Sequence, residues 1–172
     1  GLVIYRKSSR YVDIRQAIAI RAAIASDVLC VVLLVNADKE FVKQVIAEVK
    51  PDLLQFHGDE SAEFCQQFGF PYIRALRMRD DLNIAAEAKA FKSAHSLLFD
   101  AWHPGQYGGT GERFDWSRLP TERNFNLILA GGLTPDNVAE SVAAVAPDMV
   151  DVSGGVELAP GITDPLQVCD LI

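Results

Sequence analysis

Two glycine pairs follow apolar runs in this sequence, and each could bind an anion. In the first, Gly131 and Gly132 follow a short apolar run and precede Thr134, at an N-cap position, and Pro135, at the first helical position. Without side chains, the glycines let a ligand approach the backbone N–H groups at the helix start, where an anion is favoured. The alternative interpretation is an ordinary tight turn with a helix cap.

The second glycine pair lies in residues 151–157, again directly after an apolar run. Ser153 offers a hydroxyl group, and Gly154 and Gly155 offer exposed backbone amides. In (β/α)₈ barrels the loops after strands 7 and 8 frequently make a phosphate site. The two pairs would occupy those loops if one strand–helix unit preceded the first expected strand. We therefore predict a phosphate site formed by both pairs.

A carboxyl group suited to proton transfer stands at the end of another apolar run. Asp100 follows Ser96–Phe99. Partial burial at a strand end would favour its protonated form, so Asp100 is a candidate acid or base. A loop-capping role is the alternative. The glycine-rich segment that follows, which includes Gly109, is a candidate lid.

Three further polar residues could bind substrate. Alternation along an expected strand would point Gln55 and His57 to one side and Phe56 to the other. Arg10 lies in the loop after the first expected strand and could bind a carboxylate through two hydrogen bonds. The alternatives are a structural histidine and a solvated loop charge.

Strands and helices alternate along the whole sequence. The expected strands are the apolar runs 2–5, 28–35, 53–56, 72–76, 96–99, 127–130 and 149–152. The expected helices are 14–25, 39–50, 61–68, 81–92, 135–145 and one from about Asp164. This alternation predicts a parallel sheet with helical crossovers, and no dinucleotide-binding glycine fingerprint follows the first strand. We predict an α/β fold, a TIM (β/α)₈ barrel over residues 1–172 as a single domain, with its first βα unit apparently lacking.

Composition excludes several classes of function. The chain has 172 residues and a formal net charge of −7, which argues against nucleic acid or an anionic membrane as the main partner. Its apolar runs are too short for a membrane-spanning helix, and no secretory signal opens it. The cysteines, Cys30, Cys65 and Cys169, have no metal-ligand spacing and are expected to be reduced thiols of a cytoplasmic protein.

The ordered set of motifs resembles the phosphoribosylanthranilate isomerase family. The matching segments run through nearly the whole chain: 9–12, 35–36, 54–60, 99–101, 108–111, 114–116, 129–138, 151–157, 160–161 and 164. The resemblance implies an Amadori rearrangement of a phosphorylated small molecule in tryptophan biosynthesis, without cofactor or metal. It implies that Asp100 is the general acid and that Arg10 holds the anthranilate carboxylate. Gln55 and His57 match positions on the active-site face, and the phosphate would be surrounded by Gly131, Gly132, Ser153, Gly154 and Gly155, with Gly109 in the substrate-binding set.

The sequence departs from the family at the general base. The family uses a cysteine on its first strand, in a Lys-Ile/Val-Cys-Gly segment that this sequence does not contain. We therefore expect the base upstream of residue 1, with both ends of the barrel incomplete here. Two alternatives are a non-catalytic, phosphate-binding truncated barrel and the isomerase domain of a bifunctional tryptophan enzyme. The choice between monomer and homodimer stays open.

Overall fold

The computed structural model describes residues 1–101 and 113–171. The chain divides into two compact units, Gly1–Arg74 and Ala75–Ile172. The predicted lid segment and Gly109 within it lie outside the described residues.

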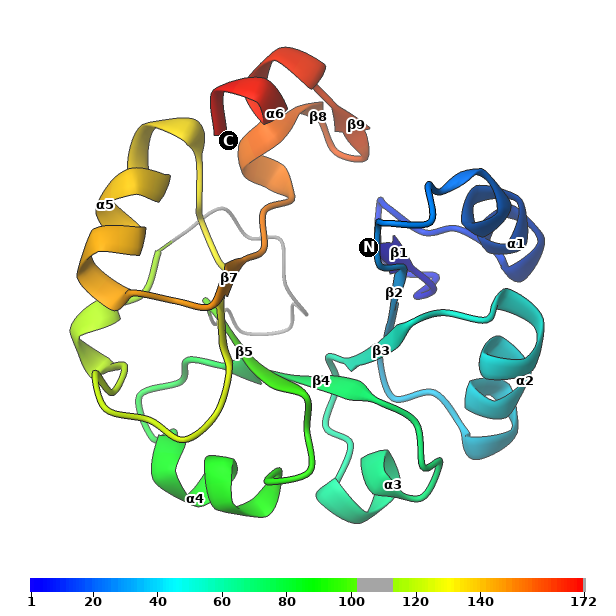
Figure 1. The fold of residues 1–172 in the computed structure, drawn as a ribbon, viewed down its shortest axis with the longest axis horizontal. Helices are drawn as coiled ribbons and strands as arrows, with labels where there is room; N and C mark the ends of the chain where they lie inside the picture. The colour runs from blue at the N-terminus through cyan, green and yellow to red at the C-terminus, as the bar shows by residue number, and fades with distance from the viewer. Residues whose placement is uncertain (102–112, 172) are drawn as a thin grey trace. The chain divides into compact units, whose positions relative to one another are not determined.

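The first unit alternates parallel strands with helices. Its strands pair in chain order, β1 with β2, β2 with β3, and β3 with the start of β4. Their helices lie on one side of the strands (Figure 1). The bounds are β1 (Leu2–Val3), α1 (Ile14–Ala23), β2 (Val31–Leu34), α2 (Lys39–Val49), β3 (Leu53–Phe56), α3 (Ala62–Gln66) and β4 (Tyr72–Arg77).

Side-chain caps set where these helices begin. The carboxylates of Asp13 and Asp38 accept the N–H groups of Gln16 and Phe41, each at 2.8 Å. Such caps satisfy donors that the first helical turn leaves without an intrahelical partner. Helix α2 ends at Lys50, whose φ of 52° places it in the left-handed region before Pro51.

Aromatic rings fill the space between β3 and α3. Phe56 packs edge-on against Phe64 at 6.1 Å and Tyr72 at 5.8 Å, and stacks on Phe68 at 6.2 Å between ring centroids. Such pairs stabilise a core beyond the area they bury. Because Phe56 points into this core, the residues before and after it in sequence, Gln55 and His57, are turned to the other side.

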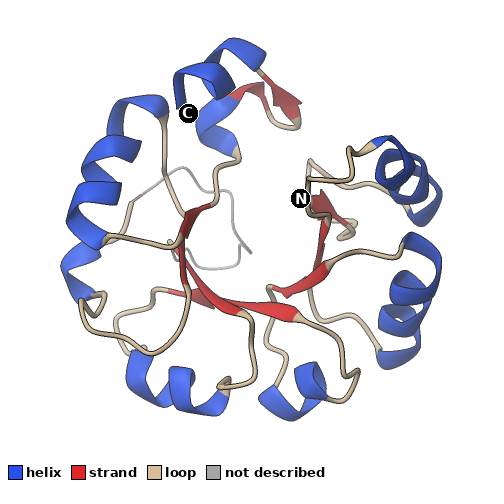
Figure 2. Ribbon diagram, viewed as in Figure 1, coloured by secondary structure: helices blue, strands red, loops and turns tan. Residues whose placement is uncertain are grey.

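The second unit continues the same alternation. β5 pairs with β6 and β6 with β7, all parallel, and Met78 after β4 donates its N–H to the Asp100 carbonyl at 2.9 Å. Figure 2 shows helices α4 and α5 beside these strands. The bounds are α4 (Ile84–Ala90), β5 (Ser96–Asp100), η1 (Trp116–Arg118), β6 (Leu127–Leu129), α5 (Pro135–Val145), β7 (Met149–Val150), η2 (Gly154–Val156), β8 (Glu157–Ala159), β9 (Ile162–Thr163) and α6 (Pro165–Leu171).

Each of the seven expected strands is found among the described residues, but the expected bounds differ in places. The apolar run 28–35 contributes a strand only over Val31–Leu34, and the side chains of Val28 and Leu29 are exposed. The Cys30 N–H before this strand donates to the Asp52 carboxylate at 2.7 Å instead of to a neighbouring strand. The antiparallel β8–β9 pair was not expected; it forms around Gly161, whose φ is 83°.

No helix within residues 1–101 and 113–171 is both long enough and apolar enough to cross a membrane.

Candidate active site

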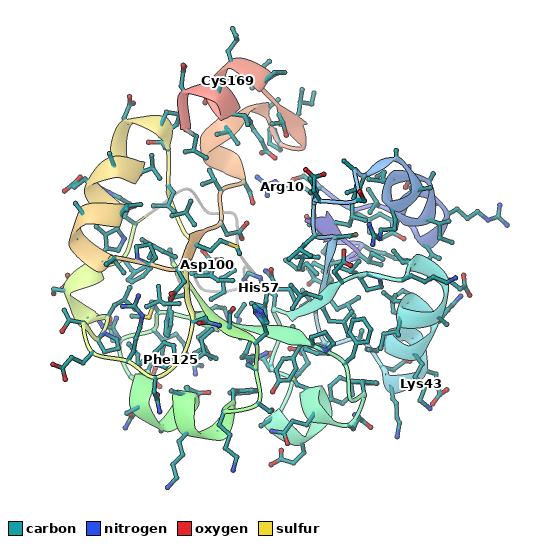
Figure 3. All side chains as sticks on the ribbon, viewed as in Figure 1. Arg10, Lys43, His57, Asp100, Phe125 and Cys169 are labelled. Carbon is teal, nitrogen blue, oxygen red and sulfur yellow. The ribbon has the colours of Figure 1, made fainter. Side chains whose placement is uncertain are left out.

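The carboxyl group of Asp100 lies against the first glycine pair. Asp100 ends strand β5 and is 5% exposed. Gly131 follows β6, which stays paired with β5 as far as the bond from the Ala130 N–H to the Phe99 carbonyl, at 2.9 Å. A Cβ atom on Gly131 would come within 2.9 Å of Asp100 Oδ1 and 2.5 Å of the Ala101 nitrogen. The absence of a side chain at Gly131 is therefore what lets the Asp100 carboxylate, labelled in Figure 3, approach this loop.

The second glycine pair lies against the segment that follows the first, because Gly155 contacts Leu133 and Thr134. A Cβ atom on Gly155 would overlap the Leu133 carbonyl oxygen. Leu133 and Val156, which flank this contact, are both buried. The loops after β6 and β7 therefore lie together beside the start of α5.

Asn137 fixes the first glycine pair to helix α5. Its side-chain oxygen accepts the Thr134 N–H at 3.0 Å, and its side-chain nitrogen donates to the Gly132 carbonyl at 2.9 Å. Pro135 occupies the first turn, as expected. The residue type three positions after an N-cap could have revealed this role of Asn137, because amide side chains there bond back to the cap.

In the first unit, Gln55 and His57 share one side of strand β3, as alternation predicted. Gln55 Nε2 and His57 Nδ1 are 3.2 Å apart. Both residues are buried, at 6% and 5% exposure, and His57 is labelled in Figure 3. The contact joins the Gln55 amide to the imidazole ring and fixes the direction in which the ring faces.

A buried ion pair beside the backbone of His57 was not anticipated from the sequence. Arg74 Nη1 lies 2.8 Å from Glu60 Oε2, with side-chain exposures of 9% and 4%. A buried charge pair is tolerated only when further hydrogen bonds satisfy it. A buried arginine in an apolar strand was the available signal, since arginine is rarely buried without a partner.

Arg10 lies in a tightly folded loop after β1. Its N–H donates to Ser8 Oγ at 3.1 Å, and Tyr11 forms an isolated bridge with Val3. The Val12 N–H donates to the Val3 carbonyl at 2.9 Å, which returns the loop to the edge of β1. Arg10 as a whole is half-buried.

Cys30 and Cys65 are buried and Cys169 is exposed on α6, and all three are free thiols. Burial raises the pKa of the Cys65 thiol to about 12, and burial is also the main cause that raises the pKa of Cys30. Both buried thiols are therefore protonated at neutral pH.

Thiol labelling provides a direct check of this arrangement. In the folded protein at pH 8 we expect maleimide to modify Cys169 alone, since the thiolate fraction of a group whose pKa is about 12 is only about 10⁻⁴. The raised pKa of Cys65 contributes stability that is full below pH 9 and is lost as the pH rises toward 12. Mass spectrometry of digested protein would locate the label. Cys169→Ser should leave almost no labelling, and rapid native modification of Cys65 would contradict the burial.

Within the described part of the chain, no group of three or more His, Cys, Asp or Glu side chains is arranged to hold a metal ion.

Comparison with known proteins gives consistent matches in sequence. A family model for N-(5'phosphoribosyl)anthranilate (PRA) isomerase matches residues 1–172. The N-(5'-phosphoribosyl)anthranilate isomerase of Neisseria meningitidis serogroup C is 47% identical over 172 residues, which cover 100% of this chain and 83% of that protein. The isomerase of Pseudomonas fluorescens Pf-5 is 50% identical over 168 residues, covering 98% and 80%.

Solved structures agree. Phosphoribosyl anthranilate isomerase from Thermotoga maritima superposes with a TM-score of 0.87 at 34% identity, over 99% of this chain and 84% of that one. A phosphoribosyl anthranilate isomerase in complex with reduced 1-(o-carboxyphenylamino)-1-deoxyribulose 5-phosphate gives 0.83 at 30% identity, over 99% and 83%. The expected α/β fold of the TIM-barrel class is confirmed by these similarities.

Proposed function

The chain belongs to the N-(5'-phosphoribosyl)anthranilate isomerase family, and we propose from this premise how its own residues divide the work of the reaction. It is an intramolecular aldose–ketose isomerase of tryptophan biosynthesis. The Amadori rearrangement converts an aminoaldose, phosphoribosylanthranilate, into the aminoketose 1-(o-carboxyphenylamino)-1-deoxyribulose 5-phosphate.

Asp100 is the general acid of this proposal. It donates its proton to the ribose ring oxygen as the bond from that oxygen to C1′ breaks, and the anthranilate nitrogen becomes a protonated Schiff base. A base then removes the C2′ proton, and the resulting enol tautomerises to the ketone. Two observations support this role: Asp100 ends β5 with its side chain buried, and its carboxylate lies beside the Gly131 backbone.

The two glycine pairs bind the phosphate. Gly131 and Gly132 present backbone amides at the start of the 11-residue helix α5, where the helix dipole favours an anion. Ser153, Gly154 and Gly155 provide a hydroxyl and further amides from the loop that packs on Leu133. Gly109 belongs to the proposed substrate-binding set on the resemblance alone. The observation that carries the proposal is that the acid and this anion-binding element are neighbours within one unit.

Arg10 binds the anthranilate carboxylate, and Gln55 and His57 bind substrate on the same strand face. The role of Arg10 rests on its place in the loop after β1 and on the fit of a guanidinium group to a carboxylate through two hydrogen bonds. The Gln55–His57 contact holds both polar side chains on that face.

None of Cys30, Cys65 and Cys169 is proposed as the base. Two are buried with raised pKa values and the third is exposed on α6. The resemblance assigns the base to a cysteine of a Lys-Ile/Val-Cys-Gly segment. We propose that the base of this enzyme is a cysteine of such a segment, which residues 1–172 do not contain. We also propose that the enzyme works in the cytoplasm, where its three free thiols would stay reduced.

Replacing Arg10 tests the proposed binding mode. In Arg10→Ala we expect the dissociation constant for the reduced product to rise about 10- to 100-fold, the usual size of a charge-assisted hydrogen-bond pair. Calorimetry measures it without requiring turnover. Arg6→Ala removes an exposed arginine from the same loop and should bind as the wild type does. Equal effects of the two variants would show only a general loss of positive charge and would count against Arg10.

A further inference from the structure

One guanidinium group binds the backbone on both sides of His57. Arg74 stands opposite Phe56 in the parallel register of β3 and β4. Its Nη1 donates to the Phe56 carbonyl at 3.3 Å, and its Nη2 donates to the Gly58 carbonyl at 3.0 Å. The planar fork of an arginine suits two such acceptors at once, and a lysine ammonium lacks this geometry. The peptide that carries His57 is therefore held from both ends by one side chain.

Glu60 completes this clamp. Its carboxylate pairs with Arg74 at 2.8 Å and accepts the N–H of Gly58 at 2.9 Å. Its other oxygen accepts the N–H of Asn36, at the end of β2, at 2.7 Å. The Glu60 carboxylate therefore bonds the loops that follow two strands as well as the Arg74 guanidinium group.

The loop after His57 has no room to shift. A Cβ atom on Gly58 would overlap the Asn36 side chain. Asn36 has a φ of 49°, and its side-chain oxygen accepts the Asp59 N–H at 2.7 Å. Close packing of this kind restricts the backbone to one conformation.

The imidazole ring is fixed by a separate contact. The backbone N–H of His57 donates to the Leu34 carbonyl at 2.9 Å. The ring nitrogen Nδ1 lies 3.2 Å from Gln55 Nε2. The backbone clamp fixes the position of the His57 main chain, and the Gln55 amide fixes the orientation of the imidazole ring. The two together aim Nε2 in one direction.

We propose that Arg74 is a positioning residue for His57, and that Glu60 holds Arg74 in place. The buried ion pair thus acts on substrate binding through the histidine that it clamps, in addition to stabilising the fold. This inference rests on the proposed substrate-binding role of His57.

A double-mutant cycle between Arg74 and His57 tests the inference. We expect Arg74→Lys to lower kcat/KM about 10- to 100-fold and to raise the dissociation constant of the reduced product, because a small displacement of a binding group is costly. In a His57→Asn background the same change should have less than about a twofold further effect, since the group it positions is already gone. An effect of Arg74 on stability alone would appear equally in both backgrounds.

Arg123 provides a matched control for the arginine replacement. Its guanidinium group also binds two backbone carbonyls, here those of the adjacent residues Val145 and Ala146, and lies 3.5 Å from the Asp148 carboxylate. It does so at the end of α5, away from the glycine pairs at the other end of that helix. Arg123→Lys should lower the melting temperature while leaving kcat/KM and the dissociation constant unchanged.

Glu60→Gln keeps the test decisive if Arg74→Lys does not fold. An amide at this position would direct its NH₂ group at one of the two N–H donors that Glu60 accepts. We expect the same non-additivity with His57→Asn in the dissociation constant of the reduced product.

The outcomes separate the two proposals. If His57→Asn impairs binding and the effect of Arg74→Lys is unchanged in that background, the positioning role is wrong and the role of His57 stands. If His57→Asn leaves both binding and kcat/KM at wild-type values, the proposed role of His57 fails, and the positioning role fails with it. Loss of the Arg74→Lys effect only when His57 is replaced supports the inference.

Discussion

Asp100→Asn should lower kcat by about 10²- to 10⁴-fold, the usual contribution of a positioned acid. The amide has nearly the same shape as the carboxyl group but cannot supply the proton that opens the ribose ring. Asp100 is buried at the end of β5, so the isosteric change avoids leaving a cavity. The loss of anthranilate-type fluorescence reports turnover, and calorimetry with the reduced product reports binding.

Comparing the change in kcat with the change in affinity for the reduced product tests the role of Asp100. An acid acts on the transition state, so kcat should fall far more than the affinity for the reduced product. Asp27→Asn, an exposed replacement of the same type, should leave both unchanged. Near-wild-type turnover in Asp100→Asn would remove Asp100 from the proposed role.

The approach of Asp100 to the first glycine loop could be predicted because its signals are local in sequence. A carboxyl group directly after an apolar run, and glycine pairs directly after two others, mark the carboxyl ends of parallel strands. The structure brings Asp100 to Gly131 and packs Gly155 on Leu133, as those strand ends required. The cap at Thr134 and Pro135 likewise follows from residue types within one turn of helix.

The clamp on His57 could not be predicted in the same way. It joins Asn36, Gly58, Glu60 and Arg74, which come from different strands and loops. Which acceptors a buried arginine finds depends on the register of β3 and β4, which the sequence pattern does not specify. The exposed beginning of the 28–35 run was missed for a related reason. β-branched residues favour strands, but pairing with a neighbour decides where a strand begins.

Gly131→Ala should damage both the fold and the activity. Gly131 has a φ of 84°, and a Cβ atom there would lie 2.5 Å from the Ala101 nitrogen and 2.9 Å from Asp100 Oδ1. The left-handed conformation and the contact together should lower the free energy of unfolding by about 1–3 kcal/mol. Displacement of the Asp100 carboxylate should also lower kcat/KM by about 10²-fold.

Gly69→Ala separates the effect of the left-handed conformation from the effect of contact with Asp100. Gly69 has a φ of 57°, but a Cβ atom there would meet no other atom within 4 Å. It should therefore show the cost of the left-handed conformation, about 1 kcal/mol, with kcat/KM unchanged. Chemical denaturation measures the first quantity and steady-state kinetics the second. If Gly131→Ala matched Gly69→Ala in both, the approach of Asp100 to the glycine loop would have no part in catalysis. A selective fall in kcat/KM for Gly131→Ala would show that a glycine at this position is needed because it leaves space for the acid.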